Sequence, residues 1–243
     1  MTAHPPQRTS AQRDATRRDS ARQDSTQLNS TQRLAGFAAQ LRYQDLPAAV
    51  VEHVKLCLLD TVGCALHGAT LPWTRILRET IAELDGGGSC VIWGRPERQS
   101  CVHAALVNGA AVHAFELDDL HKVSIVHPGS VVVPAALAVA EHTGGVDGRR
   151  LLTAIVAGYE VAARVGMSVG AAHLRAGWHP TGTHGTLGAA AAAGSILGLD
   201  PERMTHALGT AGTQASGLMA AQYAAMVKRF HAGRAAQSGV YSA

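Results

Sequence analysis

PAAVVEHVKLCLLDTVGCALHGA, residues 47–69, repeats apolar side chains with the period of an α-helix. The apolar residues recur mostly three or four positions apart, at Val50, Val54, Cys57, Leu58, Val62 and Leu66. Since an α-helix completes a turn every ~3.6 residues, this spacing places them on one face. Pro47 stands at the start, where proline suits the first turn of a helix. The stretch therefore predicts one long amphipathic helix.

Similar spacing on both sides of this stretch predicts an all-α protein. Aromatic residues make up only 4% of the chain whereas glycine contributes 26 residues, a mixture that favours closely packed helices over a β-sandwich. Further helices are expected over residues 34–41, 73–84, 100–117, 131–142 with Pro134 in the first turn, 147–169, 186–198, 200–210 and in the final VKRFHAGRAAQSGVYSA segment. CVIW, residues 90–93, is expected to be a strand or an extended connection. We expect the helix that begins at Ser100 to present Asp118 and Asp119 at its end.

The first 33 residues differ in composition from the rest of the chain. Units such as SAQRDATRRDSARQDSTQ, residues 10–27, contain almost nothing apolar that could offset the conformational entropy lost on folding. We therefore expect a disordered tail rich in Ser, Thr, Gln and Arg over residues 1–33 and one helical domain over residues 34–243. A mitochondrial transit peptide is a weak alternative, because such peptides are poor in acidic residues and this tail has several.

Charge and cysteine usage narrow the class of protein. The 243 residues include 21 Lys and Arg against 18 Asp and Glu, and much of the basic content lies in the tail, so we expect no nucleic-acid partner. The longest apolar stretches are interrupted before they reach the ~20 residues of a membrane span, so no membrane partner is expected. The cysteines fall in apolar stretches without paired spacing, which predicts reduced thiols and a cytoplasmic location: Cys57, Cys64, Cys90 and Cys101.

ELDDLH at residues 116–121, followed by VHPG at 126–129, brings carboxylates and imidazoles together. A carboxylate can orient an imidazole and keep its pKa near the working pH, which suits general acid and base catalysis. An equally weighted alternative is structural: Asp118 and Asp119 cap helix ends and His127 satisfies backbone groups at a turn.

GWHPTGTHG, residues 177–185, leads directly into a helix. Glycines permit close approach of the backbone, and the exposed N–H groups of a helix N-terminus attract carboxylates. An anion site beside His179 is therefore one interpretation, and a glycine-rich helix start with a core histidine carries about equal weight.

KRFHAGR, residues 228–234, is a cationic turn in an otherwise apolar segment. Lys228 and Arg229 could neutralise substrate carboxylates or stabilise an enolate-like intermediate. Taken alone, this run is more often a solvated basic helix end.

Several chemistries lack their sequence motifs. The chain contains no GxGxxG after a strand, no GxxxxGK[ST], no HExxH and no G-x-S-x-G, which removes the main support for nucleotide binding, zinc proteolysis and serine hydrolysis. Asp118 and Asp119 with His121 and His127 could ligate a divalent metal, so a metal-dependent hydrolase stays open as an alternative.

The ordered segments ELDD…HPG, GWHPTGTHG and VKRFHAG together resemble the MmgE/PrpD family. LCLLDTVGCALHG, AALVNGAAVHAFELDD, AGYEVAARVG and ALGTAGTQASGL extend the resemblance from about Leu34 to the terminus. The family includes 2-methylcitrate dehydratase, cis-aconitate decarboxylase and iminodisuccinate epimerase.

The resemblance implies a large helical domain, here without most or all of the smaller α/β lid domain, and a homodimer. It implies a lyase or isomerase that acts on a small polycarboxylate, most like 2-methylcitrate dehydratase, by proton transfer without a metal or other cofactor. The residues expected to be catalytic are His127, His179, Lys228, Asp118 and Asp119. Those expected to bind substrate are His121, Thr181, Arg229 and His231. The alternative from another class is a truncated member that folds and dimerises without catalysis.

Overall fold

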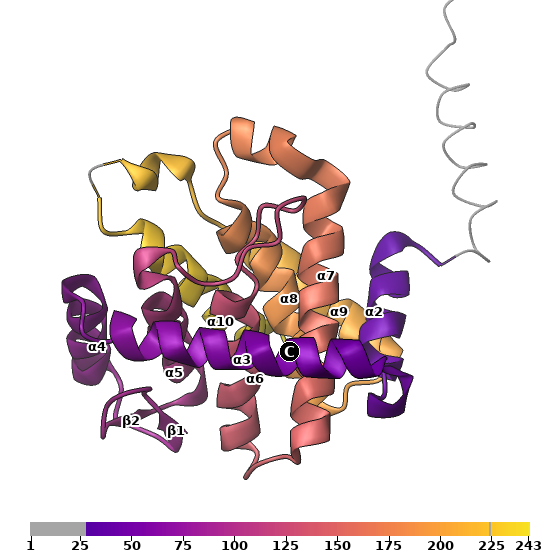
Figure 1. Cartoon of the computed structure of the whole chain (residues 1–243), viewed down its shortest axis with the longest axis horizontal. Coiled ribbons are helices and arrows are strands. Elements are labelled where there is room, and N and C mark those ends of the chain that lie inside the picture. Colours follow the sequence, from indigo (N-terminus) through magenta and orange to yellow (C-terminus); the bar gives the residue numbers. More distant parts are fainter. Residues whose placement is uncertain (1–27, 224) are drawn as a thin grey trace, which may run out of the picture.

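The computed structural model describes residues 28–223 and 225–243 and confirms an all-α architecture (Figure 1). Its helices are α2 (Ser30–Gln40), α3 (Ala48–Gly68), α4 (Pro72–Leu84), α5 (Cys101–Val112), α6 (Gly129–His142), α7 (Gly148–Arg175), α8 (Pro180–Leu197), α9 (Pro201–Gln214) and α10 (Lys228–Ser242). Short 3-10 turns are η1 (Tyr43–Asp45), η2 (His113–Phe115) and η3 (Met219–Gln222). Strands β1 (Cys90–Val91) and β2 (Arg98–Gln99) pair antiparallel, so CVIW is a strand only over its first two residues.

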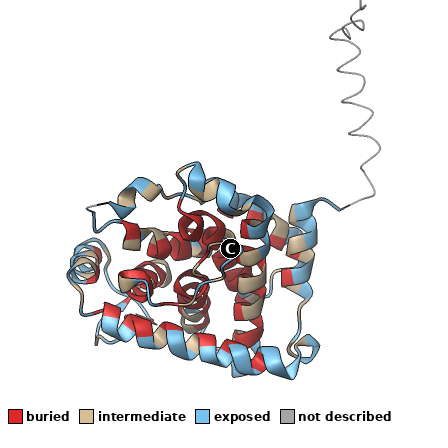
Figure 2. Cartoon of the chain, turned by 45° about the horizontal axis from the view of Figure 1, so that its top comes forward, coloured by how far each residue is buried: buried red, intermediate tan, exposed pale blue. Residues whose placement is uncertain are grey.

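The helices surround a core built from α5, α6 and α8 (Figure 2). Alanine and glycine line much of these helices, and the residues of α8 from Pro180 to Thr186 are all buried. Outer helices bury only one face: α3 runs across α5, α6 and α7 and buries Val51, Val54 and Cys57 while leaving Leu56 and Leu59 exposed. Helix α3 is therefore amphipathic, as expected, but its buried face is turned from the expected one: Val50 and Leu66 are exposed, and Thr61, Cys64 and Ala65 are buried instead.

Two contacts between α10 and the core depend on glycine. A Cβ on Gly233 would collide with the carbonyl oxygen of Leu106, and one on Gly109 would lie 2.8 Å from that of Ser130. The two glycines also face each other, since the same Cβ on Gly109 would lie 2.9 Å from the Cα of Gly233. Glycine therefore lets α10 approach α5 closely, and this places Lys228 beside the end of α5.

Helix boundaries differ from the expected ones at several points. Helix α2 begins at Ser30, inside the expected tail, because the Asn29 and Gln32 side chains form a capping box. Residues 1–27 of that tail lie outside the described residues. The expected start of the helix containing Pro134 was too late, since α6 begins at Gly129. Helix α7 continues past Val169 to Arg175 across a kink at Gly170, whose φ is 52°.

The expected helix to Leu117 was wrong. Helix α5 ends at Val112, η2 follows, and Glu116 adopts a left-handed conformation with φ 59°. A left-handed residue cannot continue a right-handed helix, so the chain turns there and Asp118 and Asp119 lie in a loop. The side chain of Glu116 forms ion pairs with two cations of α10, Lys228 and Arg229.

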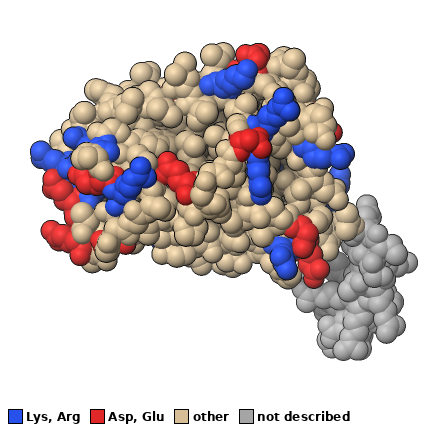
Figure 3. Space-filling model, turned by 90° about the horizontal axis from the view of Figure 1, so that it is seen from below, with Lys and Arg blue, Asp and Glu red and all other residues tan. Residues whose placement is uncertain are grey.

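Within the described residues, α7 is the one helix long and apolar enough to cross a membrane by length and composition. An 18-residue window in it reaches a mean hydropathy of 1.3, although 44% of that window is buried in the fold. Such a helix is weak evidence, because the core helix of a soluble protein passes the same test. On the described part of the face seen in Figure 3, basic and acidic side chains lie close together rather than in separate areas.

Candidate active site

Four imidazoles lie next to one another where η2, α8, α10 and the loop between α5 and α6 meet. His113 is in η2, His127 ends the loop, His179 is the residue before α8, and His231 is in the first turn of α10. Ring centroids are 4.7 Å apart for His113 and His127, 5.7 Å for His113 and His179, and 5.3 Å for His179 and His231. The fold thus brings together three of the predicted site histidines and one that was not predicted.

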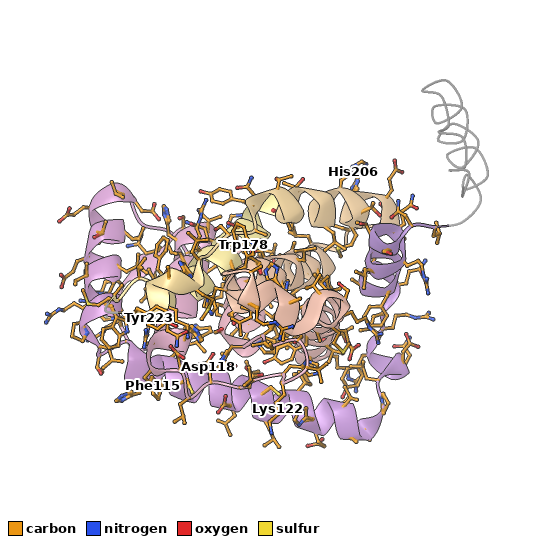
Figure 4. The ribbon with its side chains drawn as sticks, turned by 90° about the horizontal axis from the view of Figure 1, so that it is seen from above. Phe115, Asp118, Lys122, Trp178, His206 and Tyr223 are labelled. Atoms are coloured by element: carbon orange, nitrogen blue, oxygen red, sulfur yellow. The ribbon has the colours of Figure 1, made fainter. Side chains whose placement is uncertain are left out.

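Asp118 lies between two of these imidazoles. Its carboxylate oxygens are 3.1 and 3.2 Å from Nδ1 of His113, and one of them is 3.4 Å from Nδ1 of His127. The same Nδ1 of His127 also lies 3.2 Å from the backbone carbonyl oxygen of Asp118. The side chain of Asp118 is fully buried, so it acts on the site through its two histidines. Figure 4 shows Asp118 on its loop above α3.

At Asp118 and His127, hydrogen bonding outweighs the effect of burial on the pKa. Burial alone would raise the pKa of the Asp118 carboxyl, but the hydrogen bonds from His113 and His127 hold it well below its ordinary value. Burial likewise opposes the charged form of His127, and the hydrogen bond and negative charge of Asp118 outweigh it and raise the pKa of His127. His127 therefore keeps a proton more readily than an ordinary histidine.

His179 and His231 form the opposite kind of pair. Their Nδ1 atoms are 3.2 Å apart, which makes one ring the donor and the other the acceptor. Burial lowers the pKa of His179 to about 2 and also lowers that of His231, and the nearby charge of Lys228 acts in the same direction. Both rings are neutral near pH 7, so His179 can accept a proton or a hydrogen bond but is a poor proton store.

Lys228 and Arg229 lie at the start of α10 and share one carboxylate. Nζ of Lys228 is 2.8 Å from Oε2 of Glu116, and a guanidinium nitrogen of Arg229 is 3.3 Å from Oε1. Burial alone would raise the pKa of Glu116, but the hydrogen bond from Lys228 lowers it. The arrangement shows that these two cations can bind one carboxylate together.

Asp119 and Thr181 point into the protein and support the loop. Oδ1 of Asp119 accepts a hydrogen bond of 2.9 Å from the N–H of Gly129, at the start of α6. Burial raises the pKa of Asp119 to about 6. Thr181, which is fully buried, accepts the N–H of His127 at 3.1 Å. These two residues hold the backbone on either side of His127.

His121 is separate from the imidazole group. Its Nδ1 lies 2.8 Å from Oγ of Ser124, and its backbone N–H bonds to the carbonyl oxygen of Val126. Its contacts therefore close its own loop, and the described contacts do not join it to His127 or His179.

Two residues of the site, His113 and Glu116, were not among the predicted site residues. His113 is one of two polar side chains, with Asn108, in the otherwise apolar run AALVNGAAVHAF, and this was the available signal. Because the helix was expected to continue to Leu117, the left-handed turn that directs Glu116 toward α10 could not be foreseen.

Potential metal-binding atoms of His113, Asp118 and His127 lie within 4.8 Å of one another. Nδ1 of His127 faces a backbone carbonyl as well as the carboxylate, and a carbonyl oxygen accepts hydrogen bonds only. That nitrogen therefore carries a proton, and hydrogen bonds account for the spacing of the three side chains. Asp119 and His121, which the metal alternative also required, are engaged elsewhere.

Comparison with known proteins defines the class. The sequence pattern of the MmgE/PrpD N-terminal domain matches residues 32–243, and the chain belongs to the MmgE/PrpD family.

The similar proteins are cis-aconitate decarboxylases by name. A cis-aconitate decarboxylase-like protein, oryM, of Aspergillus oryzae is 39% identical over 86% of this chain and 45% of its own length. Cis-aconitate decarboxylase of Aspergillus terreus is 37% identical over 84% of this chain and 43% of its own length, and that of Homo sapiens 33% over 84% and 43%. This chain therefore spans less than half the length of these relatives.

Proposed function

We propose that this chain is a lyase subunit that decarboxylates cis-aconitate or a closely similar polycarboxylate without a metal. The names of its relatives support decarboxylation ahead of the 2-methylcitrate dehydration expected from the sequence, and dehydration and epimerisation are the alternatives. The observation that carries the proposal is His127, whose Nδ1–H binds the buried Asp118 and whose pKa is raised.

The proton chemistry follows from that hydrogen bond. With Nδ1–H committed to Asp118, the nitrogen of His127 that exchanges protons with substrate is Nε2. In decarboxylation the bond from a substrate carbon to a carboxylate breaks, carbon dioxide leaves, and the electron pair stays on the substrate. The imidazolium of His127 then gives its Nε2 proton to that carbon, and solvent restores the proton.

Substrate carboxylates would bind at Lys228 and Arg229. Both cations already hold the carboxylate of Glu116, so a substrate carboxylate would compete with Glu116 or add to it. An ammonium beside the reacting carbon also stabilises the negative charge that develops as carbon dioxide leaves. His179 and His231, both neutral near pH 7, are suited to hydrogen-bond the remaining carboxylates.

Incubating the purified chain with cis-aconitate, with and without EDTA, and following carbon dioxide and the five-carbon dicarboxylate by NMR tests the proposal. We expect turnover that EDTA leaves unchanged, and a loss of ~10²-fold or more in His127→Ala and in Lys228→Ala. The same assay with 2-methylcitrate and with aspartate-derived substrates separates the alternatives.

Folded protein without turnover on any of these substrates would instead support the non-catalytic alternative. Loss of turnover in EDTA would favour a metal-dependent enzyme. A cytoplasmic location and a homodimer belong to the proposal as well, and imaging of a tagged chain tests the first.

A further inference from the structure

His113 is the most deeply buried member of the imidazole group. Its exposed fraction is 0%, so it cannot reach a substrate bound from outside. Nδ1 of His113 binds Asp118, and Nε2 is buried without a hydrogen-bond partner among the described residues. Its ring packs edge-on against His127 and stacks on His179. A histidine placed in this way can act on the chemistry only through its neighbours.

The contacts of Asp118 show what His113 does. A buried carboxylate must have its charge compensated, and two imidazoles do this for Asp118: His113 donates a hydrogen bond, and Nδ1 of His127 lies 3.4 Å from the same carboxylate. Nδ1 of His127 donates to the backbone carbonyl of Asp118. Carboxylate and carbonyl oxygens accept but do not donate, so both Nδ1 atoms carry their protons. The negative charge of Asp118 is therefore divided between a ring that reaches the accessible side of the site, His127, and one that does not, His113.

We propose that His113 is a positioning residue that takes a share of the Asp118 charge and so keeps His127 able to release its proton. If Asp118 bound His127 alone, its undivided charge would hold a proton on His127 more tightly. A general acid works best when its pKa is close to the working pH, so an imidazolium that binds its proton too strongly donates it slowly. His113, as a second donor to Asp118, weakens the hold of the carboxylate on the His127 proton. The ring of His113 also fixes the plane of the His127 ring.

Other charged groups near the site also shift the pKa values of its histidines. Asp118 and Asp119 of the same loop raise the pKa of His127, and burial lowers it. His179, which directly precedes α8, is neutral, and the positive charge of Lys228 in α10 lowers the pKa of His179 and of His231. Glu116 is engaged by Lys228 and Arg229. Among the groups around Asp118, His113 is the one that competes directly with His127 for the carboxylate of Asp118.

The test is an NMR titration of His127 in the full 243-residue chain, assigned by comparison with His127→Gln. His113→Leu removes the donor, whereas His113→Asn keeps an N–H near the position of Nδ1. We expect the pKa of His127 to rise by about one unit in His113→Leu and to stay near the wild-type value in His113→Asn. His206→Leu, on the exposed face of α9 and far from Asp118 in Figure 4, is the matched control and should leave it unchanged.

An unchanged or lowered pKa of His127 in His113→Leu would overturn the proposal. If that variant does not fold, His113→Gln replaces it, because its amide lies nearer the position of Nε2 and cannot reproduce the bond to Asp118. The inference rests on the proposed role of His127, but the titration needs no substrate. An inactive wild type would therefore contradict the proposed function alone, and an active wild type with an unchanged titration would contradict this inference alone.

Discussion

The two neighbouring aspartates show how position decides the behaviour of one residue type. Asp118 and Asp119 are both largely enclosed, yet the pKa of Asp118 falls well below its ordinary value and that of Asp119 rises to about 6. The carboxylate of Asp118 accepts a hydrogen bond from His113 and lies 3.4 Å from Nδ1 of His127, while that of Asp119 accepts one hydrogen bond from a backbone N–H. Both carboxyls are buried, so the number and charge of the groups that donate hydrogen bonds to each one determine whether its pKa falls or rises.

Replacing Asp118 by Asn should destabilise the protein most above pH 4. A carboxyl with a lowered folded-state pKa stabilises the fold above its unfolded pKa of about 3.9, and this contribution is lost as pH falls below that value. We expect Asp118→Asn to lose about 2–3 kcal/mol at pH 7 and to show a flatter acid limb than the wild type. Urea unfolding from pH 2 to pH 7 measures both, and parallel acid limbs would contradict the assignment.

Replacing Asp119 by Asn should have the opposite pH dependence. A carboxyl with a raised folded-state pKa costs stability once it ionises, so wild-type stability falls as pH rises from about 3.9 to about 6. Asparagine can still accept the N–H of Gly129 and carries no charge. In urea unfolding, the free energy of unfolding of the variant should rise relative to that of the wild type over this pH range, by up to about 3 kcal/mol at pH 7. A stability difference that does not change with pH would refute this.

At the level of elements, the site depends on how closely α10 approaches α5. Gly233 and Gly109 permit the close contact between α10 and α5, and this contact places Lys228 next to Glu116. The Glu116 turn ends the helical segment early and directs its carboxylate toward α10. The cationic part of the site is thus a product of helix packing.

Gly233→Ala should disrupt that packing. The added methyl would collide with the backbone of Leu106, which cannot move without displacing α5, so we expect a loss of about 1–3 kcal/mol and a shifted α10. Gly209→Ala in α9, where the same methyl meets nothing within 4 Å, is the control and should stabilise by about 0.5–1 kcal/mol. Thermal unfolding compares them, and equal effects of the two substitutions would show that the close approach is unimportant.

Over the whole molecule, large apolar side chains remain exposed around the site and along α3. They include Leu56, Leu59, Leu117, Val123, Leu218 and Tyr223, each more than half exposed. Exposed apolar groups at this density favour association with another surface.

We expect the chain to form a homodimer through part of this apolar surface. Sedimentation velocity should show the dimer, and Leu59→Glu on the exposed face of α3 should weaken it, while Glu52→Gln on the same helix should not. The apparent Tm of a dimer also rises with protein concentration. A monomer at all concentrations, with a Tm that does not change, would contradict the prediction.

Helical periodicity and capping residues act over one or two turns, so they were enough to predict the all-α class, an amphipathic α3 and the segments that carry His127, His179 and Lys228. Three features became visible only in the folded protein: α5 ends before His113, Asp118 lies between two imidazoles, and Glu116 lies against Lys228. These contacts join residues up to 112 positions apart, and local spacing contains no information about them. His121 illustrates the same limit, since it stands in the predicted segment and yet its hydrogen bonds close its own loop.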